Sequence, residues 1–187
     1  EEGKVKLTDT IDTGNGVFEY YNIPMKDSHE EGYGKITVKE VFEKSSNIGI
    51  SKIIVSNYEK TPKRFVDRLL EMNLDKKLDI DIAGEAQPYI AYPDNKSWSG
   101  ISLPWMSIGY EVKLAPIQTL TFYNAIANNG VMVKPKFAKS INFHGEVIKK
   151  FKTETVNSSI CSRSTLKRVK ELLEGVVENG TANNLKN

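Results

Sequence analysis

Ser45 and Asn47 place a hydroxyl and a carboxamide two residues apart, within the run Lys44-Ser45-Ser46-Asn47-Ile48-Gly49. A hydroxyl donates and accepts hydrogen bonds at once, and a carboxamide binds a peptide group without titrating. Three small polar residues between two apolar helical stretches favour a break or tight turn, from which both side chains can project into one cleft. S-x-N alone is a weak pattern, and a turn that merely joins two helices is the alternative interpretation.

A second candidate is Ser164-Thr165-Leu166-Lys167, an S-x-x-K pattern near the start of an expected helix. This spacing puts a lysine amine one turn from a serine hydroxyl, as serine nucleophiles require. The alternative is that Ser164 is the N-cap of the helix. Lys167 lies among charged residues on an expected exposed face, whereas a lysine that activates a serine must be buried. We therefore favour the N-cap interpretation.

Other patterns give no metal or cofactor site. His29 and His144 are far apart in the sequence, and the single cysteine, Cys161, completes no zinc spacing. The glycine pairs at 14–16 and 32–34 lack the third glycine of a G-x-G-x-x-G loop. The sequence therefore predicts neither a metal nor a cofactor.

Composition permits an ordinary globular domain and excludes several classes. The chain has 187 residues, is 39% hydrophobic and 27% charged, and carries a formal net charge of +2. This mixture is unlike disordered or membrane-spanning sequences and gives no broad basic surface for nucleic acid. Because the sequence starts at Glu1-Glu2 and its first methionine is Met25, we expect a processed chain or an excised piece of a longer protein.

Helix signals surround the Ser45 turn. Thr37 and Glu40 form a T-x-x-E capping box, and Ile36 can pack against Val41 at the start of the same helix. This helix is expected to break at residues 44–47, and a second apolar helical stretch follows over 48–55. The turn with Ser45 and Asn47 is therefore expected to join two helices.

Further elements follow from periodicity and turn residues. Short strands are expected in residues 1–24, an irregular segment over 75–104, and strands over 131–152 that turn at His144-Gly145. Helices are expected from Thr61-Pro62 to about Asn73, from Pro116 to Gly130 with Ile117, Leu120, Ala125 and Ile126 inward, and over 164–178.

Five blocks of sequence carry a resemblance to a known family. They are Tyr33-Gly34-Lys35-Ile36-Thr37 through Glu43 to Gly49, Ser107-Ile108-Gly109-Tyr110, Leu114-Ala115-Pro116-Ile117-Gln118, Ala125 to Gly130 followed by Lys134-Pro135, and Val176 to Ala182. In this order and spacing they resemble the transpeptidase domain of class B penicillin-binding proteins, the cell-wall cross-linking enzymes of bacterial division and elongation. The resemblance covers nearly the whole chain.

The chain departs from the family pattern in two ways. Glu111 stands where the family usually has a second glycine after the tyrosine, which puts the local backbone shape in doubt. Of the family's ordered motifs S-x-x-K, S-x-N and K-[ST]-G, only S-x-N is present. Ser164-x-x-Lys167 lies on the wrong side of Ser45, and Lys60-Thr61-Pro62 is not K-T-G. The resemblance places the nucleophile helix before Glu1 and the K-[ST]-G strand after Asn187.

The resemblance implies an α+β fold, an incomplete β-lactamase/transpeptidase-like fold that is mainly its helical part with short strands. Residues 1–187 would be a partial penicillin-binding transpeptidase domain without the nucleophile helix and the K-[ST]-G strand. Ser45 would relay a proton between the active-site lysine and the leaving or incoming amine. Asn47 would bind the backbone amide of the substrate and help to orient the lysine.

The implied activity is a serine D,D-transpeptidase that attacks the D-Ala-D-Ala end of a peptidoglycan stem peptide and binds β-lactams. The implied parent is anchored in the bacterial inner (cytoplasmic) membrane, faces the periplasm or cell exterior, and has cell-division or elongation proteins as partners. This fragment alone is expected to be inactive. A serine β-lactamase, a β-lactam sensor and a non-catalytic cell-division interaction module are the alternatives.

Overall fold

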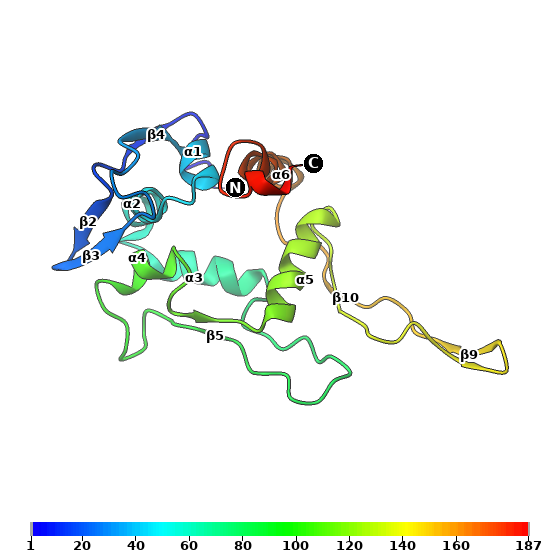
Figure 1. The fold of residues 1–187 in the computed structure, drawn as a ribbon. Helices are drawn as coiled ribbons and strands as arrows, with labels where there is room; N and C mark the ends of the chain where they lie inside the picture. The colour runs from blue at the N-terminus through cyan, green and yellow to red at the C-terminus, as the bar shows by residue number, and fades with distance from the viewer. Residues whose placement is uncertain (1, 187) are drawn as a thin grey trace.

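The computed structural model describes residues 2–186, in which helices alternate with short antiparallel strand pairs (Figure 1). The helices are α1 (Val38–Glu43), α2 (Asn47–Tyr58), α3 (Pro62–Glu71), α4 (Ser102–Met106), α5 (Pro116–Ala127), α6 (Arg163–Glu178) and the 3-10 turn η1 (Asn183–Leu185). The strands are β1 (Thr10–Asp12), β2 (Val17–Tyr20), β3 (Ile23–Lys26), β4 (Lys35–Thr37), β5 (Tyr89–Ile90), β6 (Val112–Lys113), β7 (Met132–Val133), β8 (Ser140–Phe143), β9 (Glu146–Lys150) and β10 (Thr155–Asn157). The mixed helix and strand composition confirms the expected α+β class.

The strands form separate pairs rather than one sheet. Within the described residues β1 pairs with β4, β2 with β3, β5 with β6, β7 with β10 and β8 with β9. No helix in this range is long and apolar enough to cross a bilayer. The helices, and not a continuous sheet, therefore hold the molecule together.

The start of α1 follows the capping box predicted from sequence. The Glu40 amide donates to the Thr37 hydroxyl at 3.2 Å, and the Thr37 amide donates to the Glu40 carboxylate at 2.8 Å. These backbone and hydroxyl hydrogen bonds from Thr37 hold the pKa of Glu40 below its usual value. Ile36 and Val41 are buried in one apolar cluster, so β4 and α1 are fixed as one unit.

Helix α6 lies beside α1, although the two are far apart in sequence (Figure 1). Gly175 and Gly180 allow this approach, because a side chain on Gly175 would overlap the Glu43 carboxylate and one on Gly180 would overlap the Glu43 carbonyl group. The Thr181 amide donates to that same carbonyl at 3.2 Å. The end of α6 is therefore seated on the end of α1.

The expected inward face of α5 is confirmed at Ala125 and Ile126, which are buried, but not at Leu120, which is 63% exposed. Gln118 and Thr121 are buried as well. Gln118 accepts from the Ala115 amide at 2.8 Å and donates to the Lys76 carbonyl at 3.2 Å. Because the buried face of α5 includes polar residues with hydrogen-bond partners, a prediction from hydrophobicity alone placed Leu120 on the wrong face.

Two other expectations need correction. Helix α4 begins at Ser102, inside the segment expected to be irregular. Ser162, and not Ser164, is the N-cap of α6, since the Ser162 hydroxyl accepts from the Thr165 amide at 3.2 Å. Neighbouring serines offer alternative caps, and the sequence does not rank them.

Gly180→Ala is expected to lower the free energy of unfolding by about 2 kcal/mol, because the new methyl group meets backbone that cannot move aside. Gly175→Ala meets a flexible side chain and gains helix propensity, so its loss should be smaller. Urea unfolding measures both, with the exposed α6 change Glu174→Ala as the neutral control. A Gly180→Ala midpoint equal to that of the control would contradict this packing.

Candidate active site

The turn between α1 and α2 holds Ser45 in a left-handed backbone conformation, with φ of 54°. The Ser45 amide donates to the Phe42 carbonyl at 3.1 Å, and the Ser46 amide donates to the Val41 carbonyl at 3.0 Å. This pair of bonds is the Schellman motif that ends many helices, and its left-handed position is usually glycine. A serine there costs about 1 kcal/mol, so the hydroxyl is placed at the expense of local strain.

Ser46, the middle residue of the S-x-N triplet, is buried and caps α2. Its hydroxyl accepts from the Gly49 amide at 3.0 Å and donates to the Asp27 carboxylate at 2.9 Å. The other oxygen of Asp27 accepts from the Ile48 amide at 3.0 Å. A carboxylate at a helix N-terminus is favoured by both the free amides and the helix dipole, so this cap fixes where α2 begins.

Because Ser46 points inward, its two neighbours lie on the outer side of the turn. Ser45 is exposed, and its Oγ lies 3.4 Å from Oγ1 of Thr181. Asn47 is half-buried, and its amide donates to the Lys26 carbonyl at 2.8 Å. Ser45 and Asn47 thus flank the buried Ser46 on one turn, and Thr181, which sequence reasoning did not assign to the site, lies against Ser45.

An open cavity of about 340 Å³ lies beside Asn47. Its lining residues come from three segments and are Pro24, Met25, Lys26, Asn47, Trp105, Ile108 and Tyr110. Trp105, Ile108 and Tyr110 form part of the wall, but most of the exposed lining is polar and includes the Asn47 side chain. A lining of this kind can supply the polar partners that the backbone of a short peptide needs.

Tyr20 links α2 to the wall of this cavity. Its hydroxyl donates to the Ser51 hydroxyl at 3.1 Å, and its ring centroid lies 6.1 Å from that of Trp105 in an edge-on arrangement. Burial raises the pKa of the Tyr20 phenol, so the group remains a protonated donor at neutral pH. Tyr20 therefore positions Trp105 relative to the helix that carries Asn47.

Glu111 follows Tyr110 in a left-handed conformation, with φ of 61°. Its carbonyl accepts from the Ala91 amide at 2.9 Å, and its carboxylate accepts from the Ser102 hydroxyl at 3.5 Å. The backbone shape that favours glycine is therefore retained with a glutamate in place. This resolves the doubt that the sequence raised about the segment.

The chain is similar to several known proteins. A sequence model of the penicillin binding protein transpeptidase domain matches residues 1–186. The chain belongs to this family. It is 26% identical over 164 residues to penicillin-binding protein PbpB of Mycobacterium tuberculosis, covering 87% of this chain and 23% of PbpB. It is 29% identical over 99 residues to peptidoglycan D,D-transpeptidase FtsI of Escherichia coli, covering 53% of this chain and 16% of FtsI.

A solved structure of penicillin-binding protein 3 from Mycobacterium tuberculosis, complexed with aztreonam, has a similar fold. The TM-score is 0.75 at 26% sequence identity, and the match covers 95% of this chain and 38% of that one. The chain therefore spans less than half the length of the relatives described here. The expected transpeptidase-like fold is confirmed over this part of the domain.

The S-x-x-K pattern at Ser164 and Lys167 lies outside the candidate site of this transpeptidase domain. Both side chains are exposed in the first turns of α6. The Ser164 hydroxyl is 3.0 Å from that of the N-cap Ser162. The exposure of both side chains favours a structural rather than a catalytic role for this pattern, but the prediction that Ser164 is the N-cap is wrong, because Ser162 caps α6.

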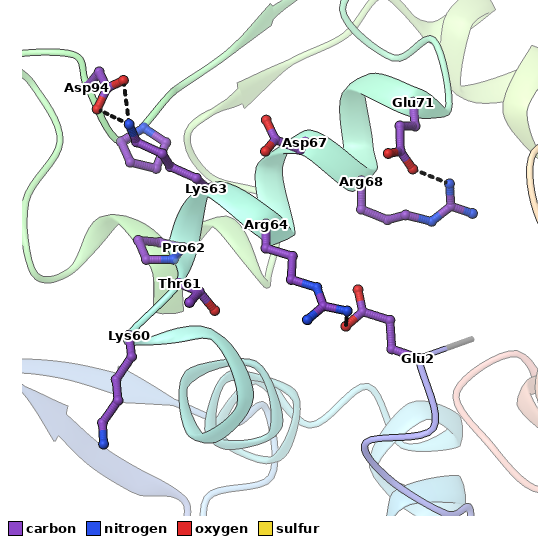
Figure 2. Close-up of a pocket in the computed structure, with 11 residues that line it drawn as sticks. Glu2, Lys60, Thr61, Pro62, Lys63, Arg64, Asp67, Arg68, Glu71 and Asp94 are labelled. Atoms are coloured by element: carbon purple, nitrogen blue, oxygen red, sulfur yellow. Dashed lines mark hydrogen bonds and ion pairs between the residues drawn. The ribbon is translucent and has the colours of Figure 1, made fainter.

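A larger cavity, of about 830 Å³, lies beside α3 and is lined mainly by charged side chains (Figure 2). Lys63 contacts both carboxylate oxygens of Asp94 at 2.7 Å, and Arg64 pairs with Glu2 at 3.1 Å. Exposed pairs of this kind contribute little to stability, because water and salt screen them. They tie the first residues and the 93–94 loop to α3, and the cavity includes neither Ser45 nor Asn47.

Ser45→Gly is expected to raise the free energy of unfolding by about 1 kcal/mol, because glycine relieves the left-handed strain. Ser45→Ala also removes the hydroxyl but keeps the Cβ, so it should leave stability near the parent value. Urea unfolding of the two variants separates strain from hydroxyl loss. Equal midpoints for glycine and alanine would show that the turn carries no such strain.

Proposed function

We propose that this chain is the middle part of the transpeptidase domain of a peptidoglycan D,D-transpeptidase, which cross-links stem peptides through a serine acyl-enzyme and binds β-lactams. The observation that carries the proposal is the Ser45 turn. The buried Ser46–Asp27 contact holds the turn so that Ser45 on one side of Ser46 is exposed and Asn47 on the other side lines a cavity of peptide size. Membership of the transpeptidase family and the named activity of FtsI support it.

Ser45 is proposed as the proton relay. In such an enzyme the nucleophilic serine gives its proton to a lysine as it attacks the D-Ala-D-Ala carbonyl, and the leaving D-Ala amine must gain a proton as the peptide bond breaks. A hydroxyl between the lysine and the amine accepts one proton as it donates another. The exposed position of Ser45, in contact with Thr181, supports this role.

Asn47 is proposed to hold the substrate backbone. One amide hydrogen is committed to the Lys26 carbonyl, which fixes the orientation of the side chain. The carboxamide oxygen has no hydrogen-bond partner within residues 2–186, so it can accept from a peptide N–H or from the active-site lysine. An extended stem peptide would then lie along the surface formed by Trp105, Ile108 and Tyr110.

The nucleophile itself is proposed to come from another part of the same domain. Residues 1–187 contain S-x-N but neither S-x-x-K before Ser45 nor K-[ST]-G after it. The coverage of longer relatives supports a partial domain. We place the parent in the bacterial inner membrane with this domain facing the periplasm or cell exterior, where its partners would be division or elongation proteins.

Residues 1–187 on their own are expected to remain unlabelled by a fluorescent penicillin, because the acylated serine is outside them. Gel fluorescence after denaturation measures covalent labelling, with a penicillin-reactive transpeptidase as the positive control. Labelling at any serine of this chain, Ser164 above all, would contradict both the proposed site and the structural role of Ser164.

In the longer protein, Ser45→Ala is expected to lower the rate of acylation by penicillin by about 100-fold or more, as loss of a positioned proton-transfer group does. Asn47→Ala is expected to lower the same rate because the substrate loses a hydrogen-bond partner that orients it. Ser164→Ala is the matched control and should react like the parent. The β-lactamase alternative is tested by measuring the release of hydrolysed penicillin. A transpeptidase should keep its acyl group, whereas rapid turnover would indicate a β-lactamase.

A further inference from the structure

The β8–β9 hairpin extends away from the helices and from the candidate active site (Figure 1, yellow). It turns at His144 and Gly145, both in the left-handed conformation, as the sequence predicts. Every residue from 141 to 150 is exposed. An isolated two-stranded hairpin is marginally stable in water, so a contact at its surface would stabilise the hairpin.

Large apolar side chains gather on this hairpin without a core to cover them. Ile141, Phe143, Val147 and Ile148 are between 49% and 66% exposed. Exposed apolar groups that lie together mark surfaces that meet another molecule or a membrane. The hairpin is therefore a candidate interaction element.

The apolar side chains lie on both faces of the hairpin. Ile141 and Phe143 alternate with Asn142 and so share one face, whereas Val147 is opposite Asn142 on the other face. Ile148 is the extra residue of the bulge between these pairs. A protein surface would cover one face of a flat hairpin, whereas immersion of the end of the hairpin buries both. The distribution of apolar side chains over both faces therefore favours immersion of the hairpin end in a membrane.

Positive charge gathers near the base of the hairpin. Residues 134–152 contain six lysines and one acidic residue, Glu146. Lys134 pairs with Glu154 at 3.8 Å, but Lys139, Lys149, Lys150 and Lys152 add charge near the base of the hairpin. Lys149 is opposite Ile141 and Glu146 is opposite Phe143, two positions further along β8, which is about 7 Å along a strand. This matches the depth of about 5–10 Å to which amphipathic elements enter the headgroup region.

We propose that the β8–β9 hairpin inserts its apolar end into the headgroup region of an anionic lipid bilayer, and that the lysines at the base of the hairpin lie at the level of the lipid phosphates. Phe143, Val147 and Ile148 enter the acyl boundary, and Lys149 and Lys150 contact lipid phosphates. Glu146 is the single unfavourable charge at this depth. The inference concerns a surface apart from the active site and does not depend on the proposed catalytic function.

Co-sedimentation of the protein with vesicles tests the proposal. Binding is expected with vesicles of phosphatidylcholine and phosphatidylglycerol, weakening as salt rises, and should be far weaker with phosphatidylcholine alone. Lys149→Gln with Lys150→Gln should lower the partition coefficient by about 25-fold, since each surface lysine contributes about fivefold. Glu146→Gln should raise it.

The apolar contribution is tested by Phe143→Ser and Ile148→Ser, each expected to lower partitioning by about tenfold or more. Leu120→Ser, an exposed apolar change on α5, and Lys167→Gln, an exposed charge change on α6, are the matched controls and should bind like the parent. Because the hairpin residues are exposed, circular dichroism should show unchanged folding in all variants.

Insertion is tested separately with Phe143→Trp. Its fluorescence, after subtraction of the signal from Trp98 and Trp105, should shift to the blue on anionic vesicles and be quenched by lipids brominated on the acyl chain. Absence of vesicle binding would overturn the proposal. Binding that depends on the lysines but not on Phe143 or Ile148, without quenching, would also overturn it and would indicate a site for a polyanion such as an acidic protein.

Discussion

The Asp27 carboxylate at the start of α2 is the contact on which the candidate site depends. One oxygen accepts from the Ser46 hydroxyl and the other from the Ile48 amide, and the group is almost fully buried. Charge-assisted bonds of this kind are short and directional. Lys26, the residue before Asp27, supplies the carbonyl that Asn47 contacts. One short segment after β3 therefore sets the position of the helix and of the amide that the helix carries.

The second constraint is the close approach of α1 and α6 at Gly175 and Gly180. It brings Thr181 to Ser45 and buries Glu43, whose charge is balanced by Lys39 at 3.9 Å. The two constraints act on opposite ends of the same turn: Asp27 fixes the residues after Ser45, and α6 fixes those before it. A serine in a conformation suited to glycine persists because its neighbours are held on both sides.

Local features of the fold were predictable from sequence, and features that depend on distant residues were not. The Thr37 capping box and the His144-Gly145 turn involve residues within a few positions of each other, so their side chains specify them. On α5, hydrophobic periodicity located the buried Ala125 and Ile126 but not the buried Gln118, whose side chain donates to the distant Lys76 carbonyl. Helix α4 has only five residues, too few to show a period.

The candidate site divides in the same way. Ser45 and Asn47 were recognisable because they match the family motif. The role of Ser46 as a buried helix cap could be identified only from the structure. The left-handed conformation of Ser45 could not be predicted from the sequence, because serine has no preference for that conformation. Thr181 lies in a block, Val176 to Ala182, that resembles the family, but nothing in the sequence indicated that this block contacts Ser45.

The contact between Ser45 and Thr181 joins residues 136 positions apart, which has a consequence for how the protein is made. At about 5–20 residues per second, the ribosome needs on the order of ten seconds to synthesise that interval. During this time α1 lacks the helix that later covers it, and Glu43 remains accessible to water. The neighbourhood of Ser45 is thus completed only after this interval, and the nascent chain is open to chaperones and proteases there until α6 emerges.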